Sequence, residues 1–166
     1  MPLGPQMIPL FSKKSRPFIG NDVRREEVII PPSQIKRLVI TKLSSNRPVL
    51  LVARDPPNIV TEKLNVNDKR LKVVWISTVD HPSAINPRDL YKLEFVIIKD
   101  VSTRRSVVIL DGVEYLILEA GLAPTMKFLA KVNDITLVNN SKLHVVLGDS
   151  LGEKEVALLK RTLGIF

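Results

Sequence analysis

The sequence predicts a three-layer α/β domain, with a mostly parallel sheet of four or five strands between helices on both faces, preceded by a basic N-terminal arm. Along the chain, short apolar runs that contain no alternating polar residues are followed in turn by segments of helical periodicity. This succession is typical of βα units. The 166 residues are 45% hydrophobic, enough for one core. Four of the twelve prolines fall in the first 21 residues, where no periodic apolar pattern occurs. We therefore divide the chain into an arm, 1–27, and an α/β domain, 28–166.

The first half of the domain contains three candidate strands. The sequence EEVIIPP, 26–32, predicts a short strand that two prolines stop. A helix is expected next, because apolar residues recur at i, i+3, i+4 and i+8, with Ser33 as its N-cap. Further apolar strands are expected within 47–57, which ends in two prolines, and at 71–78, where Trp75 is expected in the core.

The second half shows the same alternation. A helix is expected within 86–102, capped by Asn86 or Asp89, and the strand SVVILDG follows at 106–112. The stretch 113–138 is mostly helical, with a break at EAGLAP, where glycine and proline interrupt the pattern. The last strand and the last helix are expected at 142–149 and 153–164.

The net charge of +8 is concentrated near the N-terminus. Residues 1–47 contain nine basic and three acidic residues, whereas the remaining 119 contain sixteen and fourteen. This asymmetry indicates either a segment that binds phosphate, in nucleic acid or anionic lipid, or a solubilising extension. The candidate nucleic-acid-binding residues are Lys13, Lys14, Arg16, Arg24 and Arg25, followed by Lys36, Arg37 and Lys42 on the first expected helix.

The strand that ends in Asp111, with Glu114 three residues later, has the form in which nucleotide hydrolases hold magnesium. Such enzymes also need a glycine-rich phosphate loop between a strand and a helix. The expected place, after PVLLVA, reads RDPPNIVTEK, with prolines in place of amide donors and without glycine. Asp111 is therefore expected to bind backbone donors and cap the next helix rather than hold an ion.

The sequence GDSLG, 148–152, matches the nucleophile-elbow pattern of serine hydrolases. In those folds the catalytic histidine follows the serine, but no histidine follows Ser150 here. Ser150 and Glu153 instead have the spacing of a capping box. His81 and His144, without any cysteine, provide no zinc ligand set. We predict a protein that is not an enzyme, with no metal, no cofactor and no evident small-molecule substrate.

Two features that the sequence lacks, cysteine and a long apolar run, bear on the expected compartment and on membrane insertion. The chain has no cysteine, which fits a reducing interior. Its apolar runs are much shorter than the roughly 20 residues that span a bilayer, and its start lacks the charged n-region of a signal peptide. We therefore expect a cytoplasmic protein without a membrane span.

Three blocks of the chain carry a resemblance to a known family: VVWISTVDHPSAINPRDL, VVILDGVEYLILEAG and FLAKVNDITLVNNSKLHVVLGDSLGEKEVALL. In this order they resemble an archaeal family, domain of unknown function eight-three-five, over about residues 28–163. Its most specific block here is Asp111, Gly112, Glu114 and Tyr115. The resemblance implies a RecA-like core of the degenerate P-loop type, without the phosphate loop and without enzymatic activity. The basic arm and the GDSL connection depart from the family pattern.

The sequence leaves two functions open. The first is a non-catalytic regulatory or scaffolding domain that acts through protein–protein contacts, with a partner or by self-association. Its candidate surfaces are 55–70, expected to be a loop, and the tract 79–86. The alternative is an RNA- or ribosome-associated protein that binds phosphate through its basic arm.

Overall fold

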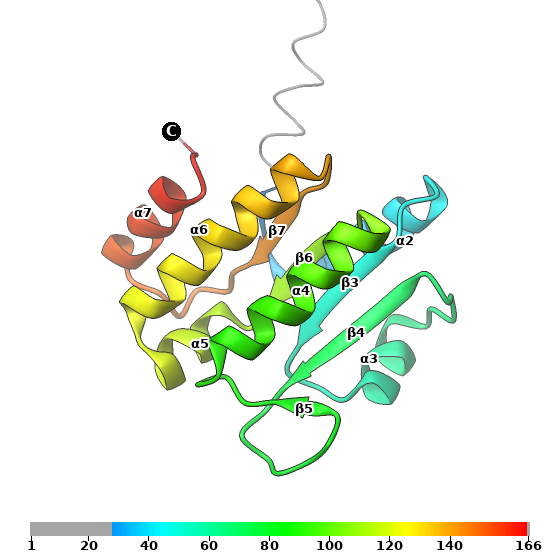
Figure 1. Ribbon diagram of the computed structural model, residues 1–166, viewed down its shortest axis with the longest axis horizontal. Coiled ribbons are helices and arrows are strands. Elements are labelled where there is room, and N and C mark those ends of the chain that lie inside the picture. Colours follow the sequence, from blue (N-terminus) through cyan, green and yellow to red (C-terminus); the bar gives the residue numbers. More distant parts are fainter. Residues whose placement is uncertain (1–27, 166) are drawn as a thin grey trace, which may run out of the picture.

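The computed structural model describes residues 28–165, and the arm, 1–27, lies outside the described residues (Figure 1). Within 28–165 the chain forms one six-stranded sheet of order β2-β7-β6-β3-β4-β5, in which every neighbouring pair is parallel. The strands are β2 (Ile29–Ile30), β3 (Val49–Ala53), β4 (Leu71–Ile76), β5 (Ala84–Ile85), β6 (Val107–Asp111) and β7 (Leu143–Val146). The predicted α/β class is confirmed, but the sheet has six strands rather than four or five. The additional strand, β5, has only two residues and is too short to produce a pattern.

Helices cover both faces of the sheet. They are α2 (Ile35–Ser44) and α3 (Pro57–Leu64) on one face, and α4 (Leu90–Arg104), α5 (Val113–Ala120), α6 (Leu122–Val138) and α7 (Glu153–Thr162) on the other. Successive side chains of β3 enter opposite cores, so Leu50 packs on the α4–α7 side and Leu51 on the α2–α3 side. Because both faces are buried, all five residues of β3 are buried and apolar.

Some helix boundaries differ from those predicted. Ser33 is not an N-cap, because Pro32–Gln34 form a 3₁₀ turn and Gln34 occupies the N-cap of α2. Of the two expected caps of α4, Asn86 and Asp89, the structure shows Asp89, since its carboxylate accepts the Lys92 N–H. The segment after β3 was expected to be a loop, yet it forms α3. Its two prolines stand at the N-cap and first position, where a helix needs no amide donor.

Two further expectations about side chains are corrected. Within the described chain no side chain caps α7, whose N-cap is Gly152, so Ser150 and Glu153 do not form a capping box. Trp75 is half-buried rather than in the core, and its Nε1–H donates to the Arg54 carbonyl at 3.1 Å. The predicted break near EAGLAP is confirmed at Gly121, which separates α5 from α6 with a φ of 99°.

A buried carboxylate organises the amino edge of the sheet. Asp100, in the penultimate turn of α4, is 5% exposed. It accepts hydrogen bonds from Arg104 (2.9 Å), from the Ser106 hydroxyl (2.6 Å) and from Lys72 at the start of β4 (3.1 Å). Burial opposes the charged carboxylate, but these donors outweigh that effect and lower the pKa of Asp100.

Arg104 extends this network to the backbone. Its guanidinium also donates to the carbonyls of Arg70 (3.1 Å) and Val49 (3.4 Å), at the starts of β4 and β3. The Ser141 hydroxyl donates to the carbonyl of Ser106, which precedes β6. The end of α4 is thus joined to the amino ends of three neighbouring strands, and the segment before β7 is attached to the same cluster.

Replacing the central carboxylate should weaken the whole fold. We expect Asp100→Ala to lower the free energy of unfolding by about 3 kcal/mol, because Arg104 and Ser106 would lose the acceptor that they bind in a buried site. Urea denaturation measures this loss. Asp134→Ala, which removes an exposed carboxylate from α6, is the matched control and should change stability by less than about 0.5 kcal/mol. Equal stability of the two variants would contradict the assigned role.

The same network predicts a pH dependence. A lowered folded-state pKa means that ionised Asp100 contributes fully above the ordinary aspartate pKa of about 3.9. This contribution is lost as the pH falls through the lower pKa of the folded state. The stability difference between wild type and Asp100→Ala should therefore shrink when urea titrations are repeated from neutral pH down to about pH 3. A difference that does not change with pH would contradict the prediction.

Candidate functional site

The strand order reverses between β3 and β6. From β3 the chain proceeds through α3 toward β4 on one face, and from β6 it proceeds through α5 and α6 toward β7 on the other. In open parallel sheets, ligands bind outside the carboxyl ends of the strands at such a reversal, where the two loops separate. The residues that meet at this point are Arg54 and Asp55 after β3, and Asp111 and Gly112 at the end of β6.

Asp111 was expected to cap the next helix, and this expectation is wrong. The residue still belongs to β6, Gly112 occupies the N-cap of α5, and no described side chain caps that helix. Burial raises the pKa of the Asp111 carboxyl, the nearby carboxylates of Glu114 and Asp55 raise it further, and Arg54 partly offsets them. Within residues 28–165 no side-chain hydrogen bond or ion pair satisfies this carboxyl group.

Glu114 has a different role in the same motif. Its Oε2 accepts the Gly148 N–H (3.1 Å) and the Ser150 hydroxyl (3.3 Å). The carboxylate therefore attaches the first turn of α5 to the β7–α7 connection. The GDSL serine has this carboxylate as its hydrogen-bond partner, whereas His144 is buried within β7.

Tyr115 contacts the connection that follows β3. The guanidinium carbon of Arg54 lies 3.4 Å from the centroid of the Tyr115 ring, in a cation–π contact. Arg54 also accepts the Trp75 indole N–H at its carbonyl, which joins the exit of β3 to the end of β4. The four motif residues thus lie together at the carboxyl edge, and two of them, Glu114 and Tyr115, hold neighbouring loops.

The basic residues predicted to bind nucleic acid are separated by the structure. Lys13, Lys14, Arg16, Arg24 and Arg25 lie outside the described residues. On α2, Lys36 and Arg37 are exposed, while Lys42 is half-buried. Of the two candidate contact segments, 55–70 contains α3, and 79–86 contains β5 and a turn in which His81 lies 5.4 Å from Trp75, ring to ring.

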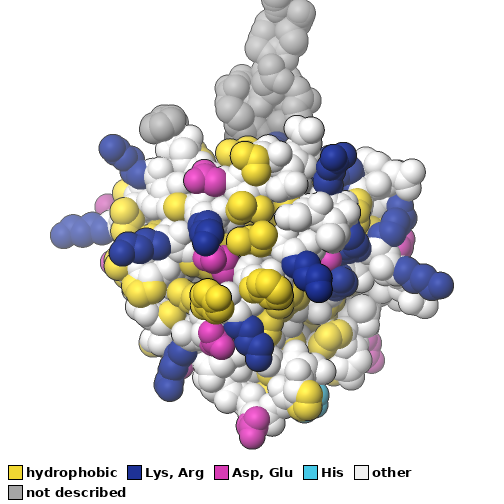
Figure 2. Space-filling model, viewed as in Figure 1, with side chains coloured by type: hydrophobic (Ala, Val, Ile, Leu, Met, Phe, Trp, Pro, Cys, Tyr) yellow, Lys and Arg dark blue, Asp and Glu magenta, His cyan; other side chains and the backbone are white. Residues whose placement is uncertain are grey.

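An exposed apolar surface on the α4–α6 side was not expected from the sequence. Tyr91 and Phe95 on α4 are 82% and 63% exposed, and α5 and α6 add Leu118, Leu137 and Val138. Figure 2 views this side and shows hydrophobic side chains with Lys and Arg among them. We call these five residues the α4–α6 surface. A signal was present in the sequence, because Tyr91 and Phe95 are four residues apart and lie off the stripe formed by Leu93 and Ile97.

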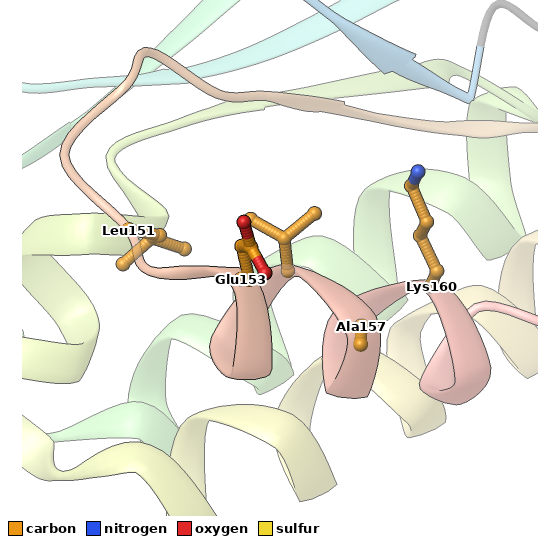
Figure 3. A pocket seen from close by; sticks show the side chains of 5 residues that line it. Leu151, Glu153, Ala157 and Lys160 are labelled. Carbon is orange, nitrogen blue, oxygen red and sulfur yellow. The ribbon is translucent and has the colours of Figure 1, made fainter.

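Other features of the described residues carry less information. A hollow of about 350 Å³ lies on α7, where Glu153, Ala157 and Lys160 line it with Leu151 and Val156 (Figure 3). It contains none of the motif residues. Residues 28–165 include no group of three His, Asp or Glu side chains that could hold a metal ion. They also include no helix that is long and apolar enough to cross a membrane.

The all-parallel sheet, its covered faces and the reversal between β3 and β6 define the class of protein, a three-layer α/β domain. The chain belongs to the family described as "Protein of unknown function (DUF835)", whose pattern matches residues 29–163. The resemblance to this family found in the sequence is thereby confirmed, while the archaeal origin and the RecA-like core stay predictions. A comparison with curated proteins finds no match.

Gly112 provides a test of the motif's structural role. Its φ is 135°, and a Cβ there would lie 2.9 Å from Ile76 Cδ1. We expect Gly112→Ala to cost about 1–3 kcal/mol of stability, because both the backbone and the packing would be strained. Urea denaturation measures it. Gly148→Ala is the control, since its Cβ would make only an ordinary 3.7 Å contact with Glu114. A Gly112→Ala protein as stable as the control would refute the expectation.

Proposed function

We propose that this chain is a non-catalytic regulatory or scaffolding domain that binds a partner protein through the α4–α6 surface. The observation that carries the proposal is the exposure of Tyr91 and Phe95, which lie one turn apart on the same helix. Exposed apolar clusters with polar surroundings mark interaction sites, and aromatic side chains supply much of the energy at such sites.

The charges around this surface specify the partner further. Helices α4 and α6 lie side by side, joined by the Lys131–Glu94 ion pair (2.8 Å) (Figure 1). Lys92, Lys99 and Lys127 on the same helices are exposed and form no ion pair with a described residue. A partner that presents apolar side chains flanked by acidic residues complements this surface. Two copies of the surface would bring lysines against lysines, so a second copy of this chain fits it less well.

RNA or ribosome binding through the arm is the alternative. The exposed Lys36 and Arg37 of α2, the first described helix after the arm, are the described residues that favour it. They lie on the face of the sheet opposite to the α4–α6 surface. The two functions therefore predict effects of substitutions on different faces.

The decisive comparison is between two apolar-to-polar changes. The double variant Tyr91→Ser/Phe95→Ser should weaken binding of a partner captured from native extract, and then purified, by at least about tenfold. Ile40→Ser, a change at an exposed apolar residue of α2, is the control and should leave that affinity unchanged. Calorimetry on purified components measures both affinities.

Specific outcomes would contradict the proposal. If the double variant and the control bind the partner equally well, the α4–α6 surface is not the docking site. If the wild type captures only RNA-dependent material that Lys36→Gln/Arg37→Gln loses, the alternative function replaces the proposed one. Light scattering that shows a dimer abolished by the double variant would overturn the inference that the partner is a different protein.

A further inference from the structure

A cavity of about 240 Å³ opens at the reversal between β3 and β6, on the α2–α3 face of the sheet. Four segments that are distant in the sequence line it: the start of α2, the end of β3, helix α3 and the end of β6. The cavity lies on the opposite face from the α4–α6 surface, so its role is independent of the proposed protein contact. The position is the one where open parallel sheets bind ligands.

The cavity has an apolar wall of aliphatic side chains. Leu51, Ala53, Val60 and Leu64 line it together with Ile35, and the first four are buried. Its volume is below the roughly 300–1,000 Å³ of sites for drug-sized molecules. A compact aliphatic body therefore matches it better than a nucleotide or an extended chain.

The charged groups on the rim of the cavity differ in their contacts with other described residues. Asp55 and Lys63 form an ion pair with each other (2.7 Å). Asp111 and Lys36 line the same cavity, and neither forms a hydrogen bond or an ion pair within the described chain. Arg54 lies on the Tyr115 ring and adds a second positive charge to the rim. A ligand with a single charge would satisfy only one side of this arrangement.

We propose that this cavity binds a small aliphatic zwitterion, of the class of the aliphatic amino acids. Its ammonium group binds the Asp111 carboxylate, its carboxylate binds Lys36 with help from Arg54, and its hydrocarbon chain packs on the wall formed by Leu51 and Val60. Asp111 is half-buried, and pairing its carboxylate with an ammonium group recovers solvation that the carboxylate has lost, whereas Lys36 is exposed and supplies the opposite charge at the rim.

The ammonium contact also predicts how binding depends on pH. The groups that face Asp111 are Arg54 and Asp55 after β3, and Glu114 on α5, and with burial they leave its pKa raised. Lys36 and Lys63 complete the charged rim. Only the ionised carboxyl group attracts an ammonium group, so affinity should fall as the pH drops through the raised pKa of Asp111.

The test uses the full chain and three matched probes. Leucine carries both charged groups, 4-methylpentanoate lacks the amine, and 3-methylbutylamine lacks the carboxylate. Calorimetry should show leucine binding at least about tenfold more tightly than either half-ligand, as expected when one charged hydrogen bond is lost. Leucine should also raise the melting temperature, because it binds the folded state alone.

Substitutions test which residue binds the ammonium group of the ligand and which binds its carboxylate. Asp111→Asn should weaken leucine binding at least about tenfold but leave 4-methylpentanoate unchanged, and Lys36→Gln should weaken leucine but leave 3-methylbutylamine unchanged. Arg37→Gln, a neighbouring exposed residue that does not line the cavity, is the matched control and should leave leucine binding intact. Circular dichroism confirms that each variant is folded.

The outcomes separate the proposal from its competitors. Absence of binding by leucine and valine at millimolar concentration overturns it. Equal affinity for leucine and 4-methylpentanoate would show an anion site instead, and an Asp111→Asn protein that binds leucine like the wild type would remove the acid from the site. None of these results bears on partner binding at the α4–α6 surface.

Discussion

The hydrogen-bonded carboxylate of Asp100 is the interaction on which the rest of the fold depends most. It lies near the end of α4, yet with Arg104 it joins the amino ends of β3, β4 and β6. A parallel sheet needs long crossovers, and the crossover that contains α4 returns the chain from the β5 edge to the middle of the sheet. The end of this crossover lies at the start of β6, which pairs with β3 where the strand order reverses. The buried charge is tolerated because several donors satisfy it.

The two edges of the sheet consequently differ in character. At the amino edge, polar groups bind one another and stabilise the strands. At the carboxyl edge, Glu114 contacts the loop that follows β7, and Tyr115 contacts the loop that follows β3. Asp111 ends β6, the strand between β7 and β3, and its side chain forms no hydrogen bond with a described residue. The motif thus combines two positioning residues, Glu114 and Tyr115, with a half-buried carboxyl group, Asp111, that lines the cavity proposed to bind a ligand. Gly112 makes this arrangement possible, because its φ of 135° suits glycine alone among common residues.

The helical layers divide the surface in a similar way. On the α2–α3 side, two short helices leave an aliphatic cavity open at the strand reversal. On the other side, the longer helices α4 and α6 cover the sheet together with α5 and α7, and Tyr91, Phe95 and Leu118 on these helices are exposed to solvent. Burying one stripe of α4 already satisfies its packing, so the aromatic residues outside this stripe add nothing to the core. These exposed aromatic residues and the cavity lie on opposite faces of the sheet, so the two proposed binding functions are independent of each other.

The sequence by itself determined the class of fold, because runs such as VLLVA and VVIL are apolar at every position and a sheet covered on both faces buries such runs. It also determined local features that depend on neighbouring residues, such as the break at Gly121, and it limited the cap of α4 to Asn86 or Asp89. Only the tertiary structure decided that Ser150 binds Glu114, that Asp111 shares a cavity with Lys36, and that Asp100 binds Lys72. These residues are separated by 28 to 75 positions, and local periodicity carries no information about contacts over such separations.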